Sequence, residues 1–247
     1  MDNKDKNGNG NDLIKDFATG EKKEQELSLF NRIIGVFISP EETFRDIKRK
    51  ADILKPGILL MMIFAVVFLI QKDLIKTQVI NQLKAVAAVN PDYEITDSLV
   101  TTSLRTGIIV GVLSALINPV FKGLLVHGIA MLRNGKAKLK ASMSVLVYSY
   151  FIVALGQVVV AILKSMTGNI YLTLSPAVFF SGLEPTSVQF VLLSYFDVFT
   201  IGYLIISIIG IRLVHEFNYK KAAMAVLLPS LIYLLILVAS SATALMA

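Results

Sequence analysis

Five long apolar segments, separated by segments that hold almost all of the charged residues, constrain this chain more than any other feature of its sequence. They cover residues 57–70, 107–132, 143–163, 188–211 and 222–247. An α-helix rises about 1.5 Å per residue, so about 20 apolar residues cross the ~30 Å hydrocarbon core of a bilayer. Four segments reach that length. The first crosses only if it extends to residues 53–75, with Lys55 and Lys72 reaching back to the head groups.

This pattern predicts an all-α, polytopic membrane protein with five transmembrane helices. Hydrophobic residues make up 55% of the chain and charged residues 17%, which differs from the composition of an ordinary soluble domain. The chain has no cysteine, which excludes disulfides, thiolate nucleophiles and thiolate metal sites. The net charge of +6 does not indicate nucleic acid as a partner, because the excess bases flank apolar segments, where anionic lipid attracts them.

The distribution of basic residues predicts the orientation of the five helices, because short loops rich in Lys and Arg stay on the cytoplasmic side of a membrane. Residues 45–55, 133–142 and 212–221 are rich in bases, whereas the charges of residues 76–105 and 164–187 are balanced. We therefore predict a multi-pass protein of the cell membrane with its N-terminus in the cytoplasm and its C-terminus outside. A four-helix alternative would leave residues 76–105 in the cytoplasm.

Three regions follow each other along the chain. Residues 1–25 are polar with few apolar side chains and predict a disordered cytoplasmic tail, residues 26–52 predict two amphipathic helices, and residues 53–247 predict the five-helix domain. The residues expected at the membrane interface are Phe30, Ile33, Phe37, Phe44 and Ile47. The helix pair either lies on the inner membrane surface, with its bases level with the phosphates, or packs against the bundle.

Only two charged residues lie deep in the apolar segments, Lys122 in the second and Asp197 in the fourth. A charge there costs about 2.5–3.5 kcal/mol on insertion scales, so each charge needs a partner or a function. We predict an ion pair between the two residues, within a polar seam of Ser114, Asn118, Lys122, Ser194, Asp197 and Thr200. The seam either holds helices together by hydrogen bonds or lines a path for a solute or a proton.

Sequence motifs of enzymes are missing from the chain. It contains no HExxH, GxSxG or P-loop sequence and only two histidines. An intramembrane aspartyl protease needs two facing aspartates, and the apolar segments supply only one. His127 lies near the end of its segment, where an interfacial position is expected rather than a catalytic one. We therefore predict that the protein is not an enzyme and uses no cofactor or metal.

Several stretches occur in the order found in one family of membrane proteins. They are Ile38-Ser39-Pro40-Glu41-Glu42-Thr43-Phe44, residues 125–150 with Gly135 and Tyr148-Ser149, and residues 196–201 followed by Gly210 and Lys221-Ala222. In these stretches the chain resembles the prokaryotic branch of the YIP1 family. Gly202 stands where the family often has tryptophan, a residue that this chain lacks.

The resemblance implies five membrane-spanning helices after a cytoplasmic segment. Eukaryotic members of the family are similar to adaptors of vesicle traffic, which associate with prenylated Rab-type GTPases and with one another. We expect a non-enzymatic scaffold or adaptor whose partners are the lipid bilayer and other membrane proteins or a second copy of the chain. The alternative is a permease for a small molecule or ion. A scaffold predicts a dry, paired Lys122 and Asp197, whereas a permease predicts a hydrated cavity that reaches them from one side.

Overall fold

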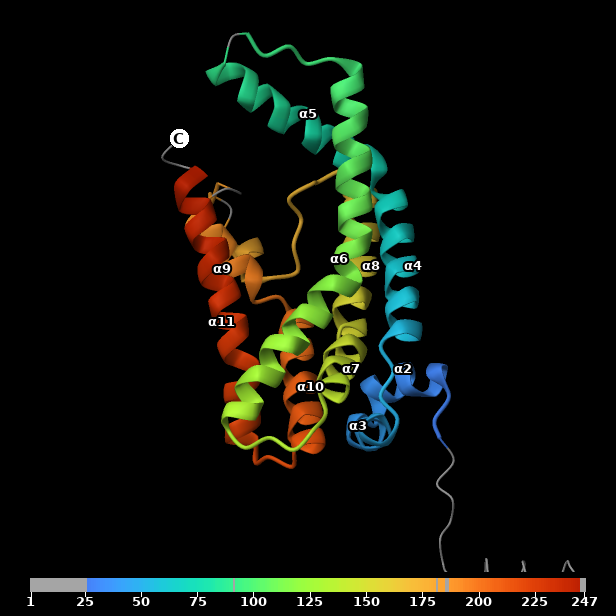
Figure 1. The fold of residues 1–247 in the computed structure, drawn as a ribbon. Coiled ribbons are helices and arrows are strands. Elements are labelled where there is room, and N and C mark those ends of the chain that lie inside the picture. Colours follow the sequence, from blue (N-terminus) through green and yellow to red (C-terminus); the bar gives the residue numbers. More distant parts are fainter. Residues whose placement is uncertain (1–25, 91, 181, 185–186, 245–247) are drawn as a thin grey trace, which may run out of the picture.

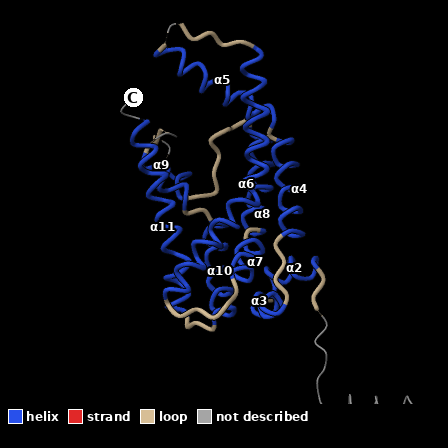
Figure 2. The backbone as a smooth tube through the Cα atoms, viewed as in Figure 1, coloured by secondary structure: helices blue, strands red, loops and turns tan. Residues whose placement is uncertain are grey.

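The computed structural model describes residues 26–244 apart from 91, 181, 185 and 186, so the predicted tail 1–25 lies outside the described residues. The described chain contains α-helices, one short 3-10 helix and no β-strand (Figures 1 and 2), and the predicted all-α class is confirmed. The helices are α2 (Leu29–Ile38), α3 (Pro40–Arg49), α4 (Leu54–Ile70), α5 (Lys72–Val89), α6 (Asp97–Leu132), α7 (Leu139–Ser149), α8 (Phe151–Thr167), η1 (Pro176–Phe179), α9 (Val188–Tyr195), α10 (Val198–His215) and α11 (Tyr219–Ala244).

Four helical spans in the described part of the chain are long and apolar enough to cross a membrane. They are Asp97–Leu132, Leu139–Thr167, Val198–His215 and Tyr219–Ala239. The second of these consists of α7 and α8 together. A fifth span exists only if α4 and α5 are taken as one, and these two helices are bent by 72° at their junction. The protein is therefore a helical membrane protein with four or five candidate spans, as the apolar segments predict.

The first apolar segment ends earlier than the predicted extension to residue 75. Its helix α4 stops at Ile70, and Lys72 and Asp73 begin α5, which runs across the end of the bundle (Figure 1). The 17 residues of α4 rise about 26 Å, slightly less than the thickness of the hydrocarbon core. A straight continuation would bury two charges in lipid, and the bend avoids that cost. The residues from Lys72 to Val89, which the sequence analysis placed largely in an outer loop, are helical.

The fourth predicted helix, residues 188–211, is broken in its first half. Helix α9 ends at Tyr195 and α10 begins at Val198, with Asp197 as the N-cap residue of α10. Helix α9 packs against α11, and α10 packs against α3, α7, α8 and α11 (Figure 1). The break therefore places a carboxylate and the first turn of a helix, which it caps, among the apolar helices, and this shapes the candidate site.

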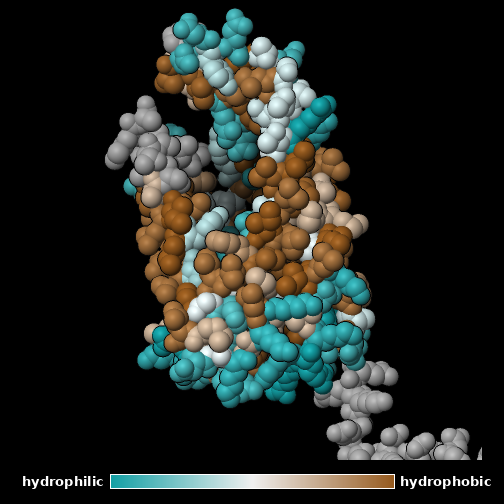
Figure 3. All heavy atoms as spheres, in the orientation of Figure 1, coloured by the Kyte–Doolittle hydropathy of each residue, from teal (hydrophilic) through white to brown (hydrophobic). Residues whose placement is uncertain are grey.

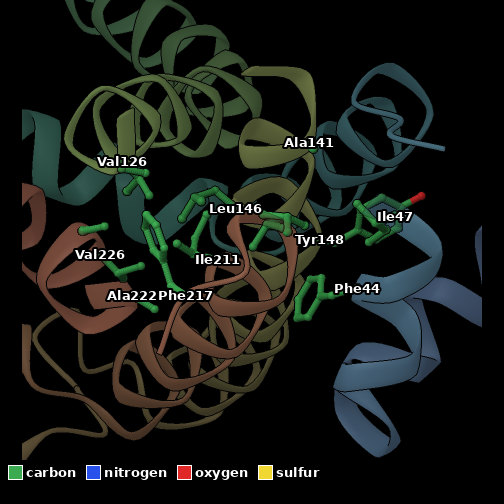
Figure 4. Packing of buried hydrophobic residues seen from close by; sticks show 14 of the residues in the cluster. Phe44, Ile47, Val126, Ala141, Leu146, Tyr148, Ile211, Phe217, Ala222 and Val226 are labelled. Carbon is green, nitrogen blue, oxygen red and sulfur yellow. The ribbon is translucent and has the colours of Figure 1, made fainter. Parts of the chain in front are cut away.

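The apolar face of the helix α3 packs against the bundle. Phe44 and Ile47 have no solvent exposure, and Figure 4 shows both side chains pointing from α3 toward the bundle, where α7 and α10 cover them. The prediction that these two residues are interfacial is wrong, because protein covers the apolar face of α3. By contrast, Phe30 and Phe37 of α2 are exposed by 68% and 44%, and Ile33 is partly buried. Of these two helices, only α2 keeps an outward apolar face.

Ion pairs fix α3 at one end of the bundle. We call this the basic end: it comprises α2, α3, the α6–α7 loop and the α10–α11 loop, and Figure 3 shows it as a hydrophilic belt. We call the opposite end, with α5, the α5 end. Glu216 accepts hydrogen bonds from Lys48 at 2.8 Å and from Lys136 at 2.7 Å. Arg32 of α2 donates to Asp46 of α3 at 2.7 Å, and both side chains are buried.

Candidate intramembrane binding site

Lys122 points from α6 toward two tyrosines and has no carboxylate partner there. Its Nζ lies 5.2 Å from the centre of the Tyr203 ring and 5.3 Å from the centre of the Tyr233 ring. A cation over an aromatic face gains about 0.5–2 kcal/mol, which offsets only part of the cost of a charge among apolar helices. Among the described residues, no Asp or Glu oxygen lies within 4.0 Å of this nitrogen. The predicted ion pair with Asp197 is therefore not formed.

Asp197 is stabilised by the start of α10 instead. Its Oδ1 accepts hydrogen bonds from the backbone N–H groups of Phe199 at 2.8 Å and Thr200 at 3.0 Å, and its Oδ2 accepts one from the Thr200 hydroxyl. The first N–H groups of a helix have no partner within the helix, and the positive end of the helix dipole favours a carboxylate. Asp197 is thus satisfied without Lys122.

A cavity of about 490 Å³ brings most of the predicted polar seam together. The seam residues that line it are Asn118, Lys122, Ser194, Asp197 and Thr200. Ser114 does not line it, and its hydroxyl donates to the Gly111 carbonyl within α6 at 2.7 Å. Side chains of α6, α8, α9, α10 and α11 form the walls, so the cavity lies where the α9–α10 break separates the packed helices.

Four tyrosines that were not predicted from the sequence complete the polar lining. They are Tyr150, Tyr195, Tyr203 and Tyr233. Each lies in or beside an apolar segment, where a tyrosine hydroxyl needs a polar partner, and this was the signal that could have identified them. The cavity therefore combines one ammonium, one carboxylate and several aromatic faces. Such a set of groups can bind a small polar solute.

A second hollow, of about 630 Å³, adjoins this cavity on the side of the α5 end. Val153, Ser194 and Asp197 line both hollows. The polar walls of the outer hollow include Gln78, Asn81 and Gln82 from α5 and Gln157 and Lys164 from α8, and Figure 3 shows the surface hollowed below α5. The Ser194 hydroxyl is buried at the junction and has no hydrogen-bond partner within the described chain. A polar molecule at this point would supply one.

The two histidines of the chain meet at the basic end around a buried serine. Ser142 Oγ lies 3.0 Å from His127 Nδ1 and 2.8 Å from His215 Nε2, and the Ala137 N–H donates to His215 Nδ1 at 3.3 Å. Because His215 Nδ1 accepts, a neutral His215 donates from Nε2 to Ser142, whose hydroxyl then donates to His127.

Ser142 has no solvent exposure, so a substrate cannot reach its hydroxyl, and the cluster joins α6, α7 and α10. The contact could not be predicted from the sequence, because the three residues come from different helices. No group of three or more His, Asp or Glu residues that could hold a metal ion occurs in the described ranges.

Comparison with known proteins identifies one family. The family model described as the Yip1 domain matches residues 34–241 of this chain. No curated protein and no solved structure matches the chain. The matched region contains every candidate span, the helix α3 and all the residues that line the cavity. This protein is therefore a multi-pass membrane protein that belongs to the Yip1 domain family.

Proposed function

We propose that this protein is a permease that binds a small polar solute carrying an anionic group, such as a carboxylate or a phosphate, in the cavity at Lys122. One observation carries the proposal: the Lys122 ammonium lines a cavity among the membrane-spanning helices and forms no ion pair with the described residues. An anionic group of the solute would supply the missing partner through charge-assisted hydrogen bonds.

The cost of an unpaired lysine supports a binding function over a purely structural one. A lysine at the centre of a membrane helix costs about 2.5–3.5 kcal/mol on insertion scales. The two tyrosine faces near Lys122 offset about 0.5–2 kcal/mol of that cost. If position 122 served only helix packing, an apolar residue there would make the protein more stable. A bound anion, by contrast, would remove the remaining cost of the unpaired Lys122 charge.

The outer hollow supports entry of the solute from the α5 end. Its walls carry five polar or charged side chains from α5 and α8, Gln78, Asn81, Gln82, Gln157 and Lys164, and it meets the cavity at Ser194 and Asp197. The Ser194 hydroxyl is without a partner there, and the Asp197 carboxylate accepts three hydrogen bonds of the roughly four that it can accept. Both residues can therefore receive a hydroxyl or amino group of the same solute while its anionic group contacts Lys122.

The experiment is a thermal unfolding screen of the purified protein in nanodiscs. Small carboxylates, phosphate esters and cationic amines are added in turn. Anionic members are expected to raise the melting temperature of the natural protein, and Lys122→Gln is expected to abolish that rise. Lys84→Gln is the matched control, because Lys84 is an exposed lysine of α5 outside both hollows, and it should keep the full response.

A second measurement separates binding from helix packing. Lys122→Met, without added solute, is expected to unfold at the same or a higher temperature than the natural protein, because it removes an unpaired charge. Uptake of the stabilising solute into proteoliposomes then tests transport. The proposal fails if no anionic solute distinguishes the natural protein from Lys122→Gln, or if Lys122→Met is strongly destabilised.

A scaffold or adaptor is a second proposal, and the exposed apolar face of α2 supports it. Phe30, Phe37 and Ile38 are exposed by 68%, 44% and 77%, on a helix that the docked α3 holds at the basic end. A patch of this kind suits another membrane protein or a second copy of the chain. Replacement of Phe30 and Phe37 with serine is expected to remove crosslinks to such a partner in native membranes. Unchanged crosslinking would argue against the adaptor.

A further inference from the structure

A groove of about 610 Å³ runs along α11, separate from the cavity at Lys122. On α11 its lining extends from Lys220 to Leu234, a distance over which a helix rises about 21 Å. Ile129 of α6, Arg133 directly after α6 and Leu204 of α10 line its other side. The hydrocarbon of one leaflet is about 15 Å thick, so the groove is long enough to reach from the head groups past the middle of a bilayer.

The wall of the groove is almost entirely apolar between its ends. Its apolar residues on α11 include Ala223, Met224, Leu227, Leu228 and Leu231, and Ser230 also lines it. Tyr195 and Phe196, from the α9–α10 break, complete the wall, with their ring centres 5.4 Å apart in an edge-to-face arrangement. The Tyr195 hydroxyl donates to the Ser230 carbonyl at 3.2 Å, which joins α9 to α11. A hydrocarbon chain fits such a lining, and a polar solute does not.

Two cations stand at the basic end of this groove. Arg133 follows the last residue of α6, and Lys220 lies in the first turn of α11. Neither forms an ion pair with a carboxylate in the part of the chain that the structure describes, whereas the nearby Lys136 is paired with Glu216. The Arg133 Nε is also buried and has no hydrogen-bond partner among those residues. An anion at the mouth of the groove would satisfy both cations.

We propose that an anionic phospholipid occupies the groove, with an acyl chain along α11 and its phosphate between Arg133 and Lys220. Arg133 directly follows one candidate span and Lys220 is the second residue of another, so we place both at the level of the head groups. Basic pockets between membrane helices bind anionic head groups, and arginine binds phosphate in a bidentate manner. The combination of a long hydrocarbon slot with two cations at one end selects a lipid over a peptide or a soluble phosphate.

The test uses the full protein in nanodiscs that contain equal amounts of phosphatidylglycerol and phosphatidylcholine. Native mass spectrometry counts the lipids of each kind that stay bound after extraction into detergent. The natural protein is expected to retain phosphatidylglycerol in preference to phosphatidylcholine. Arg133→Gln with Lys220→Gln should lower that preference about tenfold or more, as expected for the loss of two bases near a membrane surface.

The matched control is Lys55→Gln with Lys138→Gln, which removes the same charge from exposed lysines outside the groove. This control should keep the preference. Equal loss in both double variants would mean that the lipid follows overall surface charge, and no loss in either would mean that the groove holds no anionic head group. Each of these results overturns the proposal.

A further variant tests the hydrocarbon part of the site. Ala223→Phe places a ring in the groove and is expected to reduce the number of retained phosphatidylglycerol molecules while leaving the circular dichroism spectrum unchanged. Soluble glycerol phosphate, added in excess, should not displace the retained lipid, because it has no acyl chain. Displacement by glycerol phosphate, or full lipid retention by Ala223→Phe, would show a surface phosphate site instead and contradict the proposal.

Discussion

Replacement of Asp46 with alanine is expected to lower the free energy of unfolding by about 3–5 kcal/mol. Asp46 and Arg32 are both buried, and the Arg32 Nε donates to the Asp46 Oδ2 at 2.7 Å. Arg32 Nη1 also donates to the Lys50 carbonyl at 3.0 Å, but a carbonyl does not neutralise a charge. The alanine variant therefore leaves a buried cation without its counter-charge, between α2 and α3.

A double variant that removes both charges is expected to behave differently. Arg32→Met with Asp46→Leu removes both charges and keeps apolar volume in their place, so its cost should be small, within about 1 kcal/mol of the natural protein. The summed costs of the single variants Arg32→Met and Asp46→Leu should be far greater than the cost of this double variant. The difference measures the coupling between the two side chains.

Equilibrium unfolding in mixed micelles, followed by circular dichroism, gives these free energies. A loss below about 1 kcal/mol for Asp46→Ala would mean that water reaches Arg32 and that α2 and α3 are not docked as described. Strictly additive losses for the three variants would likewise refute the pairing. Either result would also reopen the alternative that these helices lie on the membrane surface.

Three further predictions concern packing and charge at other points of the fold. Gly123→Ala should lower the melting temperature and the free energy of unfolding, the latter by about 1–3 kcal/mol, because a Cβ there would lie 2.7 Å from the Met143 Cα. Gly128→Ala is the control: Gly128 has open space around it, so the change should be neutral or slightly stabilising. Phe44→Ala should cost about 3–5 kcal/mol of unfolding free energy, and a cost near zero in micelles would mean that this ring is not buried. The pKa of Glu216 is lowered from 4.5 to about 2 by hydrogen bonds from the two lysines that it contacts, so its contribution is present above pH 4.5 and is lost as the pH falls toward 2. Thermal melts of Glu216→Gln should therefore change less than those of the natural protein across this pH range, and equal changes would contradict the ion pairs.

Hydropathy alone predicts the helical membrane class and most of the spans, because lipid demands long apolar helices wherever the chain crosses it. It does not predict where such a helix stops. The apolar residues after Ile70 are consistent with a longer α4, yet a separate helix in a different direction begins at Lys72 and Asp73. The apolar run from residue 188 to 211 contains a helix start that hydropathy does not register, although Asp197 and the hydroxyl of Thr200 have the character of an N-cap.

The candidate site was predictable in its residues but not in its contacts. Five of the six seam residues share a cavity, because helical spacing sets which face of a helix they occupy. The groups that contact Asp197 and Lys122 could not be predicted, because they depend on how the helices pack in three dimensions. Asp197 is stabilised by a helix start, and Lys122 lies near tyrosines from two other helices. The buried faces of α3 were likewise ambiguous, since an amphipathic helix needs an apolar surface but does not specify whether lipid or protein provides it.

The α9–α10 break links the two proposed binding sites without making them one. Tyr195, the last residue of α9, lines both the polar cavity and the apolar groove, so a single aromatic side chain stands between a site for a charged solute and a site for an acyl chain. Lys122 lines only the cavity, and Arg133 and Lys220 line only the groove. Removal of the Lys122 charge should therefore abolish solute binding and leave the retained lipid unchanged, while the loss of Arg133 and Lys220 should do the reverse. If either change affects both ligands equally, Tyr195 does not separate the cavity from the groove. The protein would then have one continuous site with a polar and an apolar half instead of two sites.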